Sequence, residues 1–183
     1  MVPLALPHGP GGFVFWRLDQ QRFAPTWDSG EGAFQAGGRW NPAGIRAVYC
    51  ALDPATAILE VAVHRGFQVL DTLPHTLTSA GINDPGEIFV VDPAAVPNAN
   101  WLRPGTPGAG QQAFGARLMA AHRFVLIPST VSTRSWNLLF DSTRAAGAYT
   151  LLTQEAFALD TRLHPPALPP HRRRPQPRRG DGG

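Results

Sequence analysis

The segment 53–66, DPATAILEVAVHRG, constrains the fold more than any other part of the chain. It opens with an Asp-Pro pair that suits a helix N-cap and first turn, and it ends in a glycine that suits the C′ position. At roughly 100° per residue, Thr56, Glu60 and His64 share one narrow stripe, and nearly every other position is apolar. We therefore expect a buried helix with a single polar stripe.

Short β-type runs, most of them bounded by Gly, Pro, Asn or Asp, surround this helix. They cover residues 13–18, 47–51, 87–92, 124–128, 137–140 and 157–163. A second, amphipathic helix is expected over roughly 111–122. Because strands and helices follow one another without a regular βαβ rhythm, we predict an α+β fold, a single compact domain around a bent mixed sheet. The long irregular stretches at 19–46 and 93–110 are typical of binding sites.

The charge of the chain is concentrated at its end. All 16 basic residues are arginines, against 13 acidic residues, and five of the arginines lie in 165–183 together with six prolines. Such a segment cannot bury a core, so we expect a disordered Pro/Arg-rich tail. Residues 1–12 are expected to form a flexible N-terminus, which leaves one domain over 13–164. That domain is nearly neutral, which weakens the nucleic-acid-binding function that the net charge of +3 suggests.

Cysteine and histidine usage limits the cellular compartment and the cofactors. The one cysteine, Cys50, excludes an internal disulfide framework and favours a reducing compartment. No apolar run approaches the roughly 20 residues of a membrane span, and the first ten residues lack the basic region of a secretory signal. We expect a cytoplasmic, soluble protein that does not bind membranes. The six histidines are not closely paired and have no thiol partners, so no metal site is predicted.

The stretch 36–50, AGGRWNPAGIRAVYC, gives the densest indication of a ligand site. The adjacent glycines Gly37 and Gly38 let the backbone approach a ligand closely, and Arg39 offers a planar five-donor group that suits a phosphate-bearing ligand. Trp40 and Asn41 follow directly. The alternative is a hairpin turn in which Arg39 pairs with a carboxylate and Trp40 fills the core.

Four further residues are candidates, each with a structural alternative. Burying the Glu60 carboxylate on an apolar helix costs free energy unless the group is paired or lines a cleft, so Glu60 is a candidate site residue. The structural alternative is an ordinary i,i+4 pair with His64. Arg17 shares a strand face with two phenylalanines, so it either snorkels at the end of the sheet or binds a ligand. Ser129 follows an apolar strand and either caps the next segment or hydrogen-bonds a ligand. Tyr49 taken alone would be a core residue.

Taken together, these residues resemble the RES domain family, which is named after Arg, Glu and Ser. The resemblance covers roughly 13–163 and rests on WRL at 16–18, GGRWNPAG at 37–44, VYCA at 48–51, AILE at 57–60, VLIPS at 125–129, Asn137 and FALDTRL at 157–163. GGRWNP followed by Tyr49 and Glu60 at this spacing is specific. The chain departs from the family after Asn137, where LLFDSTRAA replaces a stretch that usually contains Asn-Pro-x-His.

The resemblance implies an ADP-ribosyltransferase-like fold and a toxin of a bacterial type II toxin–antitoxin pair. Such a toxin would degrade NAD⁺ by hydrolysis or phosphorolysis of the nicotinamide–ribose bond, with NAD⁺ as substrate, no prosthetic group, and inorganic phosphate as a candidate co-substrate. Its partner would be an Xre-type helix-turn-helix antitoxin, through which alone it would contact nucleic acid. The alternatives are an ADP-ribosyltransferase that modifies a protein target and a non-enzymatic nucleic-acid-binding module.

The matched positions also imply roles. Glu60 would stabilise the oxocarbenium-like transition state, and Arg39 and Tyr49 would complete the catalytic set. The residues expected to bind NAD⁺ are Arg17, Arg39, Trp40, Asn41, Tyr49 and Ser129. Within that set the two arginines would clamp the pyrophosphate.

Overall fold

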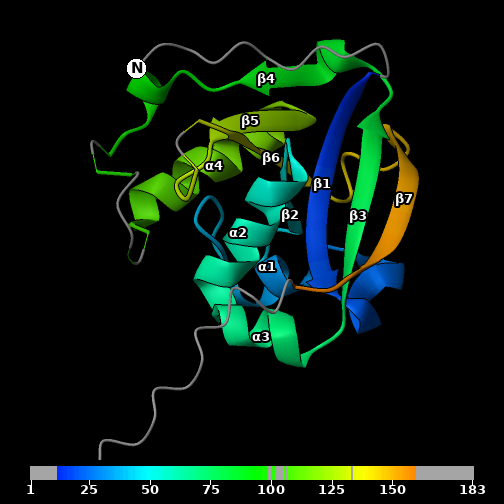
Figure 1. Ribbon diagram of the computed structural model, residues 1–183. Coiled ribbons are helices and arrows are strands. Elements are labelled where there is room, and N and C mark those ends of the chain that lie inside the picture. The colour runs from blue at the N-terminus through cyan, green and yellow to red at the C-terminus, as the bar shows by residue number, and fades with distance from the viewer. Residues whose placement is uncertain (1–11, 99, 102–104, 106, 133, 160–183) are drawn as a thin grey trace, which may run out of the picture.

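The computed structural model describes residues 12–159, apart from 99, 102–104, 106 and 133 (Figure 1). The α+β prediction is confirmed. The elements are β1 (Phe13–Gln20), η1 (Gln21–Thr26), α1 (Glu31–Ala36), β2 (Ala47–Ala51), α2 (Pro54–Arg65), α3 (Phe67–Thr72), β3 (His75–Ile82), η2 (Pro85–Glu87), β4 (Ile88–Val90), η3 (Pro93–Ala95), α4 (Ala109–Ala121), β5 (Phe124–Pro128), β6 (Trp136–Asp141) and β7 (Tyr149–Phe157). The expected tail, and the expected N-terminal segment except for Gly12, lie outside the described residues.

The strands form one mixed seven-stranded sheet in the order β4-β5-β6-β2-β1-β3-β7 (Figure 1). Only β4 and β5 pair in parallel; the other neighbours are antiparallel. The β1–β2 seam is unusual, because a single residue pair, Trp16 with Ala51, joins the two strands. By contrast, β1 and β3 pair along the full length of both strands. The sheet therefore opens at the β1–β2 seam.

Three hydrophobic clusters cover the two faces of this sheet. Because side chains alternate along a strand, Phe15 and Phe140 lie in a cluster on one face, whereas Leu139 lies in a cluster on the other. On that second face, one cluster packs beneath α4 and another, around Leu18 and Ala62, packs beneath α2 and α3. The β1–β2 seam runs between these two clusters, and this is where a cavity opens.

Most predicted elements are present, with corrected limits. The first, second, fourth and fifth predicted strands match β1, β2, β5 and β6, and the run at 87–92 shortens to β4. The last predicted strand, 157–163, is wrong: the strand found here, β7, ends at Phe157. Residues 160–163 of that prediction lie outside the described residues. Two elements were not predicted from the sequence: β3, and α1, which lies within the stretch expected to be irregular.

The capped helix is present as α2, with Asp53 as its N-cap: the Thr56 backbone N–H donates to the Asp53 carboxylate at 2.7 Å. Only part of the helix is buried, however. Ala57 and Ala62 face the interior, whereas Val63 is 59% exposed. The expectation of a fully buried helix is wrong because the cluster beneath α2 does not reach the side that carries Val63. Across the described ranges, the helices are all too short or too polar to cross a membrane.

Candidate functional site

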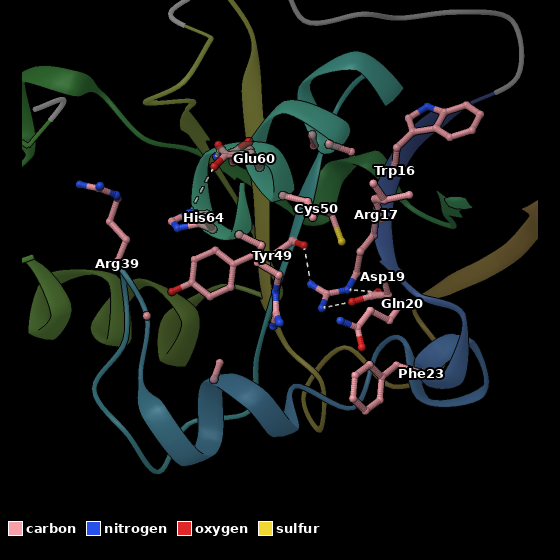
Figure 2. Close-up of a pocket in the computed structure, with 18 of the residues that line it drawn as sticks. Trp16, Arg17, Asp19, Gln20, Phe23, Arg39, Tyr49, Cys50, Glu60 and His64 are labelled. Atoms are coloured by element: carbon pink, nitrogen blue, oxygen red, sulfur yellow. Dashed lines mark hydrogen bonds and ion pairs between the residues drawn. The ribbon is translucent and has the colours of Figure 1, made fainter. Parts of the chain in front are cut away.

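A cavity of about 420 Å³ occupies the β1–β2 seam, which is within the size range of small-molecule and cofactor sites. Its wall includes Arg17, Arg39, Tyr49, Glu60, His64 and Asn137. Figure 2 shows side chains converging here from β1, β2, α2 and the loop after α1. Positions 39 and 60, which are 21 residues apart, therefore line one cavity. Among the described residues, no group of His, Cys, Asp and Glu side chains could hold a metal ion.

Glu60 is held in place by two neutral donors. The Asn137 side-chain amide donates to its Oε1 at 2.6 Å, and the Ser129 hydroxyl donates to the same oxygen at 3.0 Å. The other oxygen, Oε2, lies 3.6 Å from Nε2 of His64, whose side chain is 66% exposed. The i,i+4 pair with His64 thus exists, but it is only one part of a network that fixes the carboxylate at the cavity wall.

This network keeps Glu60 ionised. Burial favours the neutral acid, but the nearby His64 ring and the hydrogen bonds from Asn137 and Ser129 outweigh it and lower the pKa of Glu60 below its ordinary value. The carboxylate charge is therefore present at neutral pH and is lost only as the pH falls through this lowered pKa. A fixed anion in a partly water-excluded wall is suited to stabilising a developing cation.

Replacing His64 with Gln is expected to raise the pKa of Glu60, because the imidazole ring, 3.6 Å from Oε2, is one of the contacts that lower it. The midpoint would be followed by NMR titration of the Glu60 side-chain carboxyl carbon, and it should move toward the ordinary Glu value of about 4.3. Arg65→Gln is the matched control, since Arg65 also lines the cavity on α2. An equal shift in both variants, or none in His64→Gln, would contradict a specific contact.

Tyr49 anchors the loop that carries Arg39. Its hydroxyl donates to Oδ1 of Asn41 at 2.6 Å and accepts the Trp40 backbone N–H at 3.0 Å. A Cβ at Gly38 would lie 2.5 Å from the same hydroxyl, so glycine is needed for this close approach. Burial raises the pKa of Tyr49 well above its ordinary value, although the Trp40 N–H and the charge of Arg39 act in the opposite direction. Tyr49 is thus a neutral hydrogen-bonding group.

Asn41 and Trp40 form the support of this loop. Asn41 is fully buried, and its amide nitrogen donates to the carbonyl oxygens of Ala33, Pro42 and Ile45. The Trp40 indole is 2% exposed and packs edge-on against Trp101, with ring centroids 5.6 Å apart.

Ser129 is also fully buried; its hydroxyl accepts two backbone N–H groups while it donates to Glu60. Asn41 and Ser129 are not among the described residues that line the cavity.

Arg39 and Arg17 reach the cavity from different elements, the loop after α1 and the strand β1. Arg39 lines it from the loop, and its Nη1 donates to the Trp101 carbonyl at 3.2 Å. Arg17 forms a two-point ion pair with Asp19, at 2.6 and 2.8 Å, and donates to the Tyr49 carbonyl at 2.7 Å. Burial opposes the charge of Arg17, but Asp19 more than compensates and raises the pKa of Arg17. Arg17 therefore bridges the open seam between β1 and β2 as a neutralised pair (Figure 2).

Two features of the wall were missed in the sequence. Asp19 lies two residues after Arg17 on the same strand face, and strand alternation could have paired them. Asn137 was noted only as a matching position, although it makes the shortest hydrogen bond to Glu60. Its neighbours in the sequence give no sign of this contact, which joins residues 77 positions apart.

Comparisons with known proteins identify the family of this chain. The RES domain family model matches residues 14–162. The Prs ADP-ribosylating toxin of Sphingobium sp. (strain YBL2) is 31% identical over 143 residues, covering 69% of this chain and 81% of that toxin. Toxin Res of Pseudomonas putida is 30% identical over 154 residues, covering 82% of this chain and 99% of that protein.

A solved structure shows the same fold. The crystal structure of the M. tuberculosis MbcT-MbcA toxin-antitoxin complex matches with a TM-score of 0.65 at 21% sequence identity, over 79% of this chain and 84% of the matched chain. The family match spans most of the domain, and the relatives are aligned over most or nearly all of their own length. The chain therefore belongs to the RES domain family, and the relatives it matches are toxins.

Proposed function

We propose that this protein is the toxin of a toxin–antitoxin pair and that it degrades NAD⁺ by breaking the bond between nicotinamide and ribose. The main observation behind the proposal is the ionised Glu60 carboxylate, held by Asn137 and Ser129 in the wall of a cavity that Arg39 also lines. The nicotinamide of NAD⁺ is already a cationic leaving group, so the difficult step is the oxocarbenium-like transition state that its departure creates. A nearby carboxylate stabilises that cation more than it stabilises the substrate.

The roles of the other residues follow from their contacts. Arg39 would bind the pyrophosphate, since a guanidinium matches phosphate oxygens with paired donors. Tyr49 and Asn41 would position the Arg39 loop, and Ser129 would position Glu60. Trp40 would form part of the wall, held in place by its packing against Trp101. Arg17, whose charge is balanced by its ion pair with Asp19, would orient the ligand through its remaining N–H donors.

The direct test is nicotinamide release from NAD⁺ by the purified chain, followed by chromatography. Free ADP-ribose as the second product would indicate hydrolysis, and ADP-ribose 1″-phosphate formed only with added inorganic phosphate would indicate phosphorolysis. No release of nicotinamide under any of these conditions would refute the proposal.

A second candidate function is ADP-ribosylation of a protein, which is favoured by the name of the Sphingobium relative. Both reactions pass through the same cleavage and differ in the acceptor. NAD⁺ labelled in its adenylate portion distinguishes them in a cell extract: label that becomes covalently attached to protein indicates transfer, whereas label in small molecules indicates degradation.

An antitoxin partner is proposed from the comparison with a solved structure. The matched solved structure is a toxin-antitoxin complex, and an Xre-type helix-turn-helix protein remains our expectation for this chain. If a gene next to that of this chain encodes a small helix-turn-helix protein, co-expression of that protein should suppress nicotinamide release by the wild-type chain.

Arg39→Ala is expected to weaken NAD⁺ binding about tenfold to a hundredfold, as expected for losing hydrogen bonds between charged groups. Binding would be measured by calorimetry in a Glu60→Gln background, so that NAD⁺ is not consumed during the titration. Arg123→Ala in the same background is the control, because Arg123 pairs with Glu87 outside this cavity. Equal affinity for the Arg39 and Arg123 variants would contradict the pyrophosphate role.

A further inference from the structure

One end of the cavity has no role in the cleavage step. Gln20, Phe23 and His75 line it, at the end of β1, in η1 and at the start of β3. Figure 2 shows Gln20 and Phe23 on the side away from Arg39, with Tyr49 between them. Gln20 and His75 are directly opposed across the β1–β3 ladder, so their side chains share one face of the sheet.

His75 contains a buried acceptor without a partner. The residue is 2% exposed, and its Nδ1 lies 2.7 Å from the Leu73 carbonyl oxygen, to which an Nδ1–H donates. In the neutral ring this leaves Nε2 as an acceptor. Within the described part of the chain, Nε2 is buried and has no hydrogen-bond partner. An unsatisfied buried polar atom is costly, so a ligand that donates a hydrogen bond to Nε2 would relieve this cost.

Phe23 and Gln20 add the remaining features of a base-binding site. Phe23 is 45% exposed, and the Arg22 guanidinium lies over its ring, 4.6 Å from the centroid. The remaining aromatic surface is open to a planar ligand. The Gln20 side chain supplies one amide donor and one acceptor at the cavity wall. A glutamine amide is the usual two-point partner of adenine, and exposed aromatic rings are the usual stacking surface for bases.

We propose that Gln20, Phe23 and His75 form a base subsite that selects adenine, with Nε2 of His75 accepting a hydrogen bond from the 6-amino group. This inference rests on the proposed function, since adenine is the far end of the dinucleotide whose nicotinamide end is cleaved near Glu60. A base with a carbonyl at position 6, such as hypoxanthine, would place an acceptor against the Nε2 acceptor and would be disfavoured.

The test compares NAD⁺ with nicotinamide hypoxanthine dinucleotide, which differs at position 6 of the base. The wild-type chain should have at least about a tenfold higher kcat/KM for NAD⁺, the cost of leaving a buried group unpaired. His75→Phe should remove most of that preference while cleavage of the hypoxanthine dinucleotide is retained. Equal kcat/KM for the two dinucleotides in the wild type would overturn the proposal.

A second pair of variants does not depend on a buried position. Phe23→Ala should lower kcat/KM for both dinucleotides about tenfold, because both bases stack. Phe34→Ala is a closely matched control: Phe34 is 40% exposed and also has an arginine, Arg46, 4.6 Å from its ring centroid, but it does not line the cavity. Equal activity of the two alanine variants would overturn the stacking role.

Failure of the proposed function would be recognised separately. If the wild-type chain releases no nicotinamide from NAD⁺, the cleavage proposal fails, and the base subsite is then judged by calorimetric binding of ADP-ribose against its hypoxanthine counterpart. Tighter binding of ADP-ribose by the wild type, lost in His75→Phe, would support the subsite. Equal binding of the two compounds would overturn it.

Discussion

Glu60→Gln is expected to lower the rate of NAD⁺ cleavage on the order of a hundredfold to a thousandfold, the usual cost of removing one electrostatic stabiliser of a transition state. The substitution keeps the shape of the side chain, and the amide oxygen can still accept from Asn137 and Ser129, which both donate to Oε1 in the wild type. What is lost is the negative charge. Because that charge matters most when the ribose becomes cationic, kcat should fall far more than the affinity for NAD⁺.

The control for this variant is Asp53→Asn, a carboxylate-to-amide change at the N-cap of the same helix. Asp53 lies outside the cavity wall, and asparagine is an equally good N-cap residue. Single-turnover rates and NAD⁺ affinity would be measured for both variants. A Glu60→Gln chain that cleaves NAD⁺ at the Asp53→Asn rate would show that the Glu60 charge plays no part in the reaction.

The residues of the site could be predicted where the sequence pattern that positions them is local. The capped helix that positions Glu60 and the GGRWNP loop that positions Arg39 are both readable within about ten residues of sequence. The two interpretations of that loop are not exclusive. Arg39 and Trp40 both line the cavity, and Trp40 also packs in a hydrophobic cluster, as the hairpin alternative expected.

What could not be predicted depends on contacts between distant segments. The strand β3, HTLTSAGI, is rich in Thr and Ser and contains a glycine, so its sequence alone is a weak strand signal. It forms because β1 and β7 pair along its two sides. His75 becomes a cavity residue only through that pairing. The Arg17–Asp19 pair has a different cause: both residues fill a seam whose opening is a property of the whole sheet.

Gly115→Ala is expected to destabilise the fold by about 1–3 kcal/mol and to disrupt the site at the same time. Gly115 lies in α4 against the loop that carries Arg39: a Cβ there would be 2.2 Å from the Trp40 carbonyl oxygen and 2.9 Å from the carbonyl carbon. These are backbone atoms, so no change of rotamer relieves the clash, and either α4 or the loop must move. Urea denaturation followed by tryptophan fluorescence would measure the loss of stability.

Gly110→Ala makes the same chemical change in the same helix and separates packing from helix propensity. A Cβ at Gly110 would meet nothing within 4 Å, so alanine there should leave stability unchanged or raise it by up to about 1 kcal/mol. If the clash at Trp40 is real, only Gly115→Ala should lower both the denaturation midpoint and NAD⁺ affinity. Equal midpoints for the two variants would mean that α4 does not fix the position of the loop, and the placement of Arg39 would need another cause.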